Sequence, residues 1–241
     1  RANNGTISVT LNPNRETLVG NPYASALDAR DFIHDSQNQS NTTGVLKYWE
    51  QQAGATSHVL SNYVGGYALY TISAGGVDSF TPAPFFMYLL DGSPAGGPPL
   101  GPGSKVAKRY IPVGQGFMIE GNGSASNAVF RNSHRNFYKQ SDPDSDFFRE
   151  TEATTSQLDE SEYNEQGLNI VPDDFKRFRI NVGFDNNGNE SYTRQLLMNF
   201  HHTAYNGFDY GLEAPIYEQL SSDANWFLDG MPYAIQAFIY D

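Results

Sequence analysis

The sequence predicts an all-β fold, an antiparallel β-sandwich of the jelly-roll type with one short helix and long loops. Short runs of aromatic and β-branched residues recur along the whole chain, and Gly, Pro or Asn ends each run. Runs of this length separated by turn residues are typical of antiparallel strands. The 16 Phe, 15 Tyr and 2 Trp supply the bulky side chains that a large sandwich core needs.

Hydrophobic periodicity places the strands, and turn residues place the loops between them. We expect strands at 6–11, 17–20, 45–50, 67–72, 85–90, 105–113, 116–120, 127–130, 177–182, 192–200 and 233–240. The strands at 177–182 and 192–200 should form a hairpin, because the Asn187-Gly188 dipeptide between them tolerates positive φ. A helical period from Leu27 to Ile33 predicts one short helix, with Ser25 as its N-cap. Loops are expected at 35–43, 92–103 and 140–174.

Length and composition favour one sandwich domain over residues 1–241. A chain of this size buries about 70–75% of its unfolded surface, so it needs no metal or crosslink to fold. Cysteine is absent, which excludes disulfides, thiol nucleophiles and thiolate metal sites. No signal peptide precedes Arg1, and no turn signal follows the last strand. We therefore expect a fragment of a larger surface protein, with residues 1–15 as the end of a preceding module.

The formal net charge of −12 comes from 27 acidic and 15 basic residues. This balance opposes nucleic-acid binding, which needs cations against phosphate, and it opposes adhesion to anionic lipid. No apolar stretch approaches the roughly 20 residues of a membrane-spanning helix, so direct membrane insertion is not expected. The acidity favours either plain solubility or the binding of a divalent cation.

The segment Asp142-Pro143-Asp144-Ser145-Asp146 is the clearest metal-binding pattern. Carboxylates at alternate positions can surround Ca²⁺, as in the first half of an EF-hand loop, so Asp142, Asp144 and Asp146 are candidate ligands. The turn glycine and the twelfth-position glutamate of that loop are missing, and a solvated acidic loop is the simpler alternative. The segment 185–190 could also bind calcium, although a hairpin turn explains it. No other cofactor is expected.

Exposed aromatic side chains beside Asn or Asp would predict carbohydrate binding. The candidates are Tyr48, Trp49, Tyr205, Tyr210 and Trp226. Packing in the core is the alternative for aromatics inside strands. We single out Tyr205, which follows a strand, and Trp226 as ligand-binding candidates. Gly207 and Gly211 flank Phe208 and Tyr210 in an aromatic turn that should close one end of the sandwich.

Catalytic signatures are missing from the sequence. The five histidines (His34, His58, His134, His201 and His202) form no His-Glu-x-x-His motif, and no Gly-x-Ser-x-Gly is present. On a strand, His201 and His202 would point to opposite faces and could not share a metal. Two carboxylates across a cleft would suit a glycoside hydrolase or lyase, but no pair can be identified among 27 acids. We name no catalytic residue.

Several short motifs occur in an order that resembles a known family. They are NPYASALD at 21–28, LKYWE at 46–50, IPVGQGF at 111–117, FRNSHR at 130–135, FFR at 147–149, RQLL at 194–197 and GFDYGLEA at 207–214. Together they resemble the β-sandwich modules of Bacteroidetes cell-surface proteins that type IX secretion exports. The resemblance covers the chain from about residue 16 onward, but the sorting domain of that family does not follow Tyr240. It implies an extracellular location and no transferable catalytic residues.

The expected function is therefore that of a non-enzymatic, adhesin-like module that presents loops for weak multivalent contacts. Its expected partners are neighbouring modules of the same protein and surface glycans. The alternative is an accessory, carbohydrate-binding-like region of a secreted enzyme that degrades polysaccharide. A hydrolase with an unrecognised site is the third hypothesis.

Overall fold

The computed structural model describes most of the chain and shows a mainly β protein. The described residues are 5–54, 57, 59–96, 100–139, 143–145, 147–148, 175–185, 191–216 and 222–239. Within them the strands form four sheets, and both α-helices are short. The predicted all-β, sandwich-like class with long connecting segments is confirmed.

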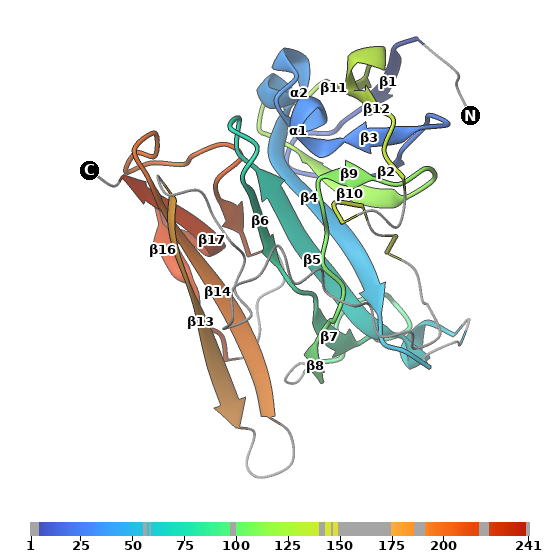
Figure 1. Ribbon diagram of the computed structural model, residues 1–241. Coiled ribbons are helices and arrows are strands. Elements are labelled where there is room, and N and C mark those ends of the chain that lie inside the picture. The colour runs from blue at the N-terminus through green and yellow to red at the C-terminus, as the bar shows by residue number, and fades with distance from the viewer. Residues whose placement is uncertain are drawn as a thin grey trace.

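A seven-stranded sheet forms the central layer of the molecule (Figure 1). Its strands, in spatial order, are β2 (Glu16–Gly20), β10 (Gly116–Gly121), β4 (Thr42–Gln51), β5 (Val64–Ile72), β7 (Pro84–Met87) and β8 (Gly101–Pro102), with β6 (Asp78–Thr81) also paired to β5. On β5, Ala68 and Tyr70 belong to the largest core cluster, whereas Leu69 between them belongs to a second cluster. Since successive residues of a strand point to opposite faces, both faces of this sheet are buried.

A five-stranded sheet covers one face of the central layer, and the hairpin predicted from the sequence is part of it (Figure 1). Its strands are β13 (Phe175–Asp185), β14 (Ser191–His201), β17 (Met231–Ile239), β15 (Ala214–Pro215) and β16 (Trp226–Leu228). β13 and β14 pair antiparallel along their whole length, with Ile180 opposite Leu196. The pairing of β14 with β17 is parallel, which the sequence pattern did not predict.

Two arginines of β13 connect the five-stranded sheet to the central one. Arg177 donates to the backbone oxygen of Asp78 at 2.6 Å, and Arg179 donates to that of Phe80 at 3.0 Å. Both acceptors lie on β6. The two guanidinium groups therefore satisfy carbonyl groups of β6 while they hold the two layers together.

Two small sheets cover the other face of the central layer, beside the helices (Figure 1). One pairs β1 (Ile7–Thr10) with β11 (Asn127–Phe130), and the other orders β12 (Arg135–Asn136), β3 (Ala26–Asp28) and β9 (Tyr110–Ile111). Here Tyr23, Leu27, Phe32 and Phe130 pack with aromatic residues of the central sheet. Since β1 pairs with β11, residues 7–10 lie within this layer.

The helical region differs from the sequence prediction in two ways. The helix predicted from Leu27 begins later, at α1 (Ala29–Ile33), because Ala26–Asp28 forms strand β3. Its N-cap is Asp28 and not Ser25, since the Asp28 side chain accepts the N–H of Arg30. The predicted loop at 35–43 contains a second helix, α2 (Ser36–Asn41). The remaining helical turns are η1 (Leu60–Asn62) and η2 (Asn132–His134).

One predicted strand is much shorter than expected, and a buried carboxylate explains it. The predicted strand at 105–113 contains only β9 (Tyr110–Ile111). Glu50, which is 3% exposed, accepts the N–H groups of Ser104 and Lys105. Because a side chain has taken these donors, the start of the segment has no need of a partner strand.

The predicted loops at 92–103 and 140–174 have different outcomes. The first contains the short strand β8, and residues 97–99 lie outside the described residues. Of the predicted loop at 140–174, only residues 143–145 and 147–148 are among the described residues. The predicted Asn187-Gly188 turn also lies outside the described residues. No helix of the described chain is long and apolar enough to cross a membrane.

Candidate functional site

The loop that leaves β14 carries Tyr205, the ligand candidate that is most open to solvent. The Tyr205 side chain is 54% exposed, and its hydroxyl donates to the backbone oxygen of Phe208 at 2.8 Å. Its ring packs so close to Gly207 that a Cβ there would lie 2.5 Å from a ring carbon. The loop therefore presents a fixed aromatic ring, since a glycine below it and a backbone bond at its tip set the orientation.

Two buried carboxylates organise this loop from inside. Asp209 is 8% exposed and accepts the N–H of Tyr205 at 2.9 Å. Glu213 is 0% exposed and accepts the N–H groups of Asp209 and Ala237, each at 3.1 Å. Burial raises the pKa of both groups, that of Glu213 to about 7, because an apolar environment disfavours charge. Neither carboxylate lines the cleft described below.

Tyr210, another aromatic candidate from the sequence, is a structural anchor. Its hydroxyl donates to the backbone oxygen of Ile33 and therefore accepts the hydrogen bond of the Thr42 hydroxyl, both at 3.0 Å. Its ring lies against Gly44, which has a φ of 75° and where a Cβ would lie 2.7 Å from the ring. The aromatic turn thus connects the segment after β14 to α1 and β4.

Trp226, the second ligand candidate, is only partly exposed on β16. Its indole N–H donates to the backbone oxygen of Leu197 at 2.9 Å, and its ring meets Phe178 edge-on. One edge of the indole is therefore occupied by the sheet itself. Tyr205 and Trp226 lie on different elements, and no hydrogen bond or ring contact joins them in the described part of the chain.

The predicted calcium ligands can be judged only at Asp144, because Asp142 and Asp146 lie outside the described residues. The Asp144 carboxylate accepts a bond from the Tyr138 hydroxyl at 3.3 Å, and that hydroxyl accepts the Asp144 N–H at 3.1 Å. Tyr138 also stacks on Tyr110, with ring centroids 4.1 Å apart. Asp144 thus fixes a stacked tyrosine pair. Within the described ranges, no three acidic or histidine side chains gather as a metal site would require.

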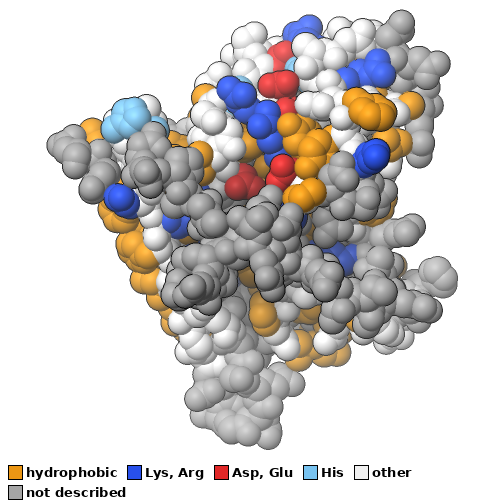
Figure 2. Space-filling view, in the orientation of Figure 1, with side chains coloured by type: hydrophobic (Ala, Val, Ile, Leu, Met, Phe, Trp, Pro, Cys, Tyr) orange, Lys and Arg blue, Asp and Glu red, His pale blue; other side chains and the backbone are white. Residues whose placement is uncertain are grey.

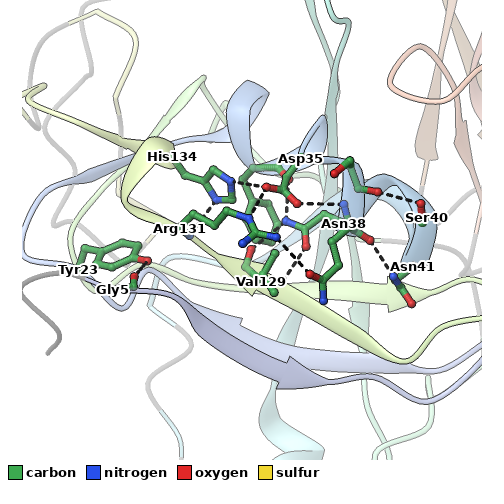
Figure 3. Close-up of polar contacts among 12 residues, drawn as sticks. Gly5, Tyr23, Asp35, Asn38, Ser40, Asn41, Val129, Arg131 and His134 are labelled. Carbon is green, nitrogen blue, oxygen red and sulfur yellow. Dashed lines mark hydrogen bonds and ion pairs between the residues drawn. The ribbon is translucent and has the colours of Figure 1, made fainter.

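His134 lies in a polar cluster between η2 and the start of α2 (Figure 3). Its Nε2 is 3.2 Å from the Asp35 carboxylate, which also accepts from Arg131 at 2.7 Å, and its Nδ1 accepts the Arg131 N–H. Burial lowers the pKa of His134, so the ring is neutral at pH 7 and donates from Nε2. Both ring nitrogens are occupied, and the side chain is 2% exposed. The cluster therefore holds the helix in place and leaves no nitrogen for a substrate.

His201 and His202 contradict the expected orientation on opposite faces of a strand. Their ring centroids lie 4.2 Å apart, because β14 ends at His201 and the chain turns there. His201 Nδ1 is 2.7 Å from the Thr203 hydroxyl, and the His201 ring stacks on Phe175. The pair caps the end of the strand.

A small cleft of about 50 Å³ lies between the central sheet and the five-stranded sheet. Lys47 and Glu16 line one wall, and Arg194 lines another. The Lys47 side chain is 1% exposed and forms ion pairs with Glu16 and Glu120, and Arg194 pairs with Asp223. Burial lowers the pKa of Lys47. Sequence reasoning missed this cleft, because its charged residues come from strands far apart in the chain.

Exposed hydrophobic side chains gather on the five-stranded sheet. Phe178 and Ile180 of β13 are 43% and 39% exposed, and Phe227, Met231 and Ile239 are at least half exposed. Figure 2 shows hydrophobic side chains along the side of the molecule that this sheet forms. A surface of this kind is typical of proteins that contact other macromolecules.

These layers and their closely packed aromatic interior define an all-β, sandwich-like protein. A family model described as a domain of unknown function (DUF8693) matches residues 1–238. The chain therefore belongs to the DUF8693 family. No curated protein and no solved structure matches the chain.

Proposed function

We propose that this protein is a non-enzymatic, extracellular module of a bacterial surface protein that serves adhesion or spacing. The observation that carries the proposal is that its buried charged side chains hold parts of the fold together. Asp28 caps α1 and pairs with Arg109, Lys47 joins three strands, and Glu50 holds the chain at Lys105. These groups stabilise the layered body, and of Asp28, Lys47 and Glu50 only Lys47 lines the cleft, whereas catalytic groups would converge on one opening.

The mechanism of such a module is passive. The rigid body presents loops and the exposed face of the five-stranded sheet to glycans and to neighbouring modules. Each contact is weak, and repetition of modules along one protein multiplies the contacts through effective concentration. The resemblance to exported Bacteroidetes modules supports the extracellular location.

Valency is the variable that tests this proposal. The purified chain is coupled to streptavidin as one copy or as four copies, and retention is measured on a glycan array and on intact bacterial cells. We expect four copies to be retained roughly 100-fold more strongly than one copy. Equal retention of the two forms, or turnover of a polysaccharide by the chain, would contradict the proposal. Removal of the protein from intact producing cells by added protease would test the location.

A second candidate function is carbohydrate binding as an accessory region of a secreted enzyme, and Tyr205 favours it. An exposed ring in a fixed orientation loses little entropy when a sugar stacks on it. Affinity electrophoresis in polysaccharide gels should show Tyr205→Ala migrating freely where the native chain is retarded. Phe137→Ala is the matched control, because Phe137 is an exposed aromatic in another part of the chain, just after β12. Equal retardation of all three proteins would remove this candidate.

A further inference from the structure

The loop between β14 and β15 is fastened to the sheet by carboxylates that contact only backbone donors. Glu213 accepts the N–H of Ala237, a residue of β17 beyond the stretch that pairs with β15 and β16. The carboxylate thus takes the place of a partner strand at that point. It also accepts the N–H of Asp209, whose own carboxylate accepts the N–H of Tyr205. A continuous chain of contacts therefore runs from β17 to the exposed Tyr205 ring.

Among the described residues, the titratable groups that act on Glu213, or on Tyr233 beside it, are all acids. Asp209 faces Glu213 within the loop, Tyr233 faces Glu213 from β17, and Asp229 lies close enough to act on Tyr233. In the part of the chain that the structure describes, no Lys, Arg or His side chain pairs with Asp209 or Glu213. When both carboxylates are ionised, two buried negative charges repel each other, and no cation of the described residues pairs with either of them, which is costly.

We propose that Asp209 and Glu213 form a pH-sensitive latch, which holds the Tyr205 loop while Glu213 is protonated and releases it when both carboxylates are charged. Glu213 has a folded-state pKa of about 7, above its ordinary value of 4.5, because of burial. A raised carboxyl pKa means that the closed loop binds more protons than the open loop between these two values. The closed state therefore weakens as pH rises from about 4.5 to 7 and changes little above that range. The latch itself does not depend on the proposed function; only the purpose of releasing the Tyr205 loop rests on it.

Hydrogen exchange of the native chain tests the latch without any ligand. The opening constant is measured at the backbone amides of Tyr205 and Asp209, with correction for the intrinsic pH dependence of exchange. From about pH 5 to pH 8, the two pKa values imply an increase of at least about tenfold. A carbon-13 titration of the Glu213 carboxyl should show its midpoint near pH 7. Unchanged protection of Tyr205, or a Glu213 midpoint near the ordinary value, would overturn the proposal.

Three variants separate the latch from general effects of pH. Glu213→Gln has no group that titrates over this range, so its opening constant should be independent of pH, although its amide NH₂ then faces one of the two backbone N–H groups. Asp209→Asn keeps an acceptor for Tyr205 but removes the neighbouring charge, so the Glu213 midpoint should move to lower pH. Asp91→Asn changes an exposed carboxylate elsewhere and should behave as the native chain does. If Glu213→Gln fails to fold, the direct titration of Glu213 and the Asp209→Asn variant still test the latch.

Discussion

Replacement of Gly44 by alanine tests how firmly Tyr210 joins the layers of the molecule. Gly44 has a φ of 75°, a left-handed conformation that costs an L-residue about 1 kcal/mol. The new Cβ would also lie 2.7 Å from the Cζ atom of Tyr210, and overpacking of this kind costs about 1–3 kcal/mol. We therefore expect Gly44→Ala to lower the free energy of unfolding by about 2–4 kcal/mol.

A double-mutant cycle separates the two contributions. Tyr210→Ala removes the ring, so Gly44→Ala in that background should cost only the conformational term of about 1 kcal/mol. Urea unfolding of the four proteins supplies the free energies, provided that the dependence on urea concentration is the same in all of them. An equal cost of Gly44→Ala in both backgrounds would refute the contact between Gly44 and the Tyr210 ring.

Three further outcomes are expected. Asn38→Ala should destabilise the chain by about 2–4 kcal/mol in urea unfolding, because buried Asn38 bonds the backbone of both Phe32 and Val129; a loss below about 0.5 kcal/mol would contradict this. Lys47→Ala should cost about 3–5 kcal/mol, since it leaves two glutamates without their shared cation, and Lys47→Met should cost nearly as much, because it restores the volume but not the charge; a Lys47→Met variant as stable as the native chain would argue against the charge effect. EDTA should leave the melting temperature unchanged, because Asp144 already engages Tyr138; a lower melting temperature would instead support calcium bridging.

The parts of the fold that were predicted correctly are those with a local signal. Apolar and polar residues alternate regularly in β13 and β14, and turn residues lie between the two strands, so their pairing follows from the sequence. Helix α2 has no such signal, because its residues Ser36–Asn41 are all polar. Asn38 holds it through bonds to Val129, which is 91 residues away. A contact of that range cannot be found from periodicity.

The candidate site was predictable only in outline. The glycines around Phe208 and Tyr210 indicated a closely packed turn, and the position of Tyr205 after a strand indicated exposure. Nothing in the sequence separates Glu213 from the other glutamates, because its burial depends on β17 folding back over the loop. The same limit applies to Asp144, because no local pattern indicates its hydrogen bond with the Tyr138 hydroxyl.

The parallel pairing of β14 and β17 has a consequence for variation within the family. Two strands that run in the same direction cannot be joined by a tight turn, so a long connection has to lead from the end of β14 back to the start of β17. Extra residues can be accommodated in such a return path without a shift in strand register. We expect related chains to differ most in length there, and the Tyr205 segment to diverge while the paired strands keep their spacing.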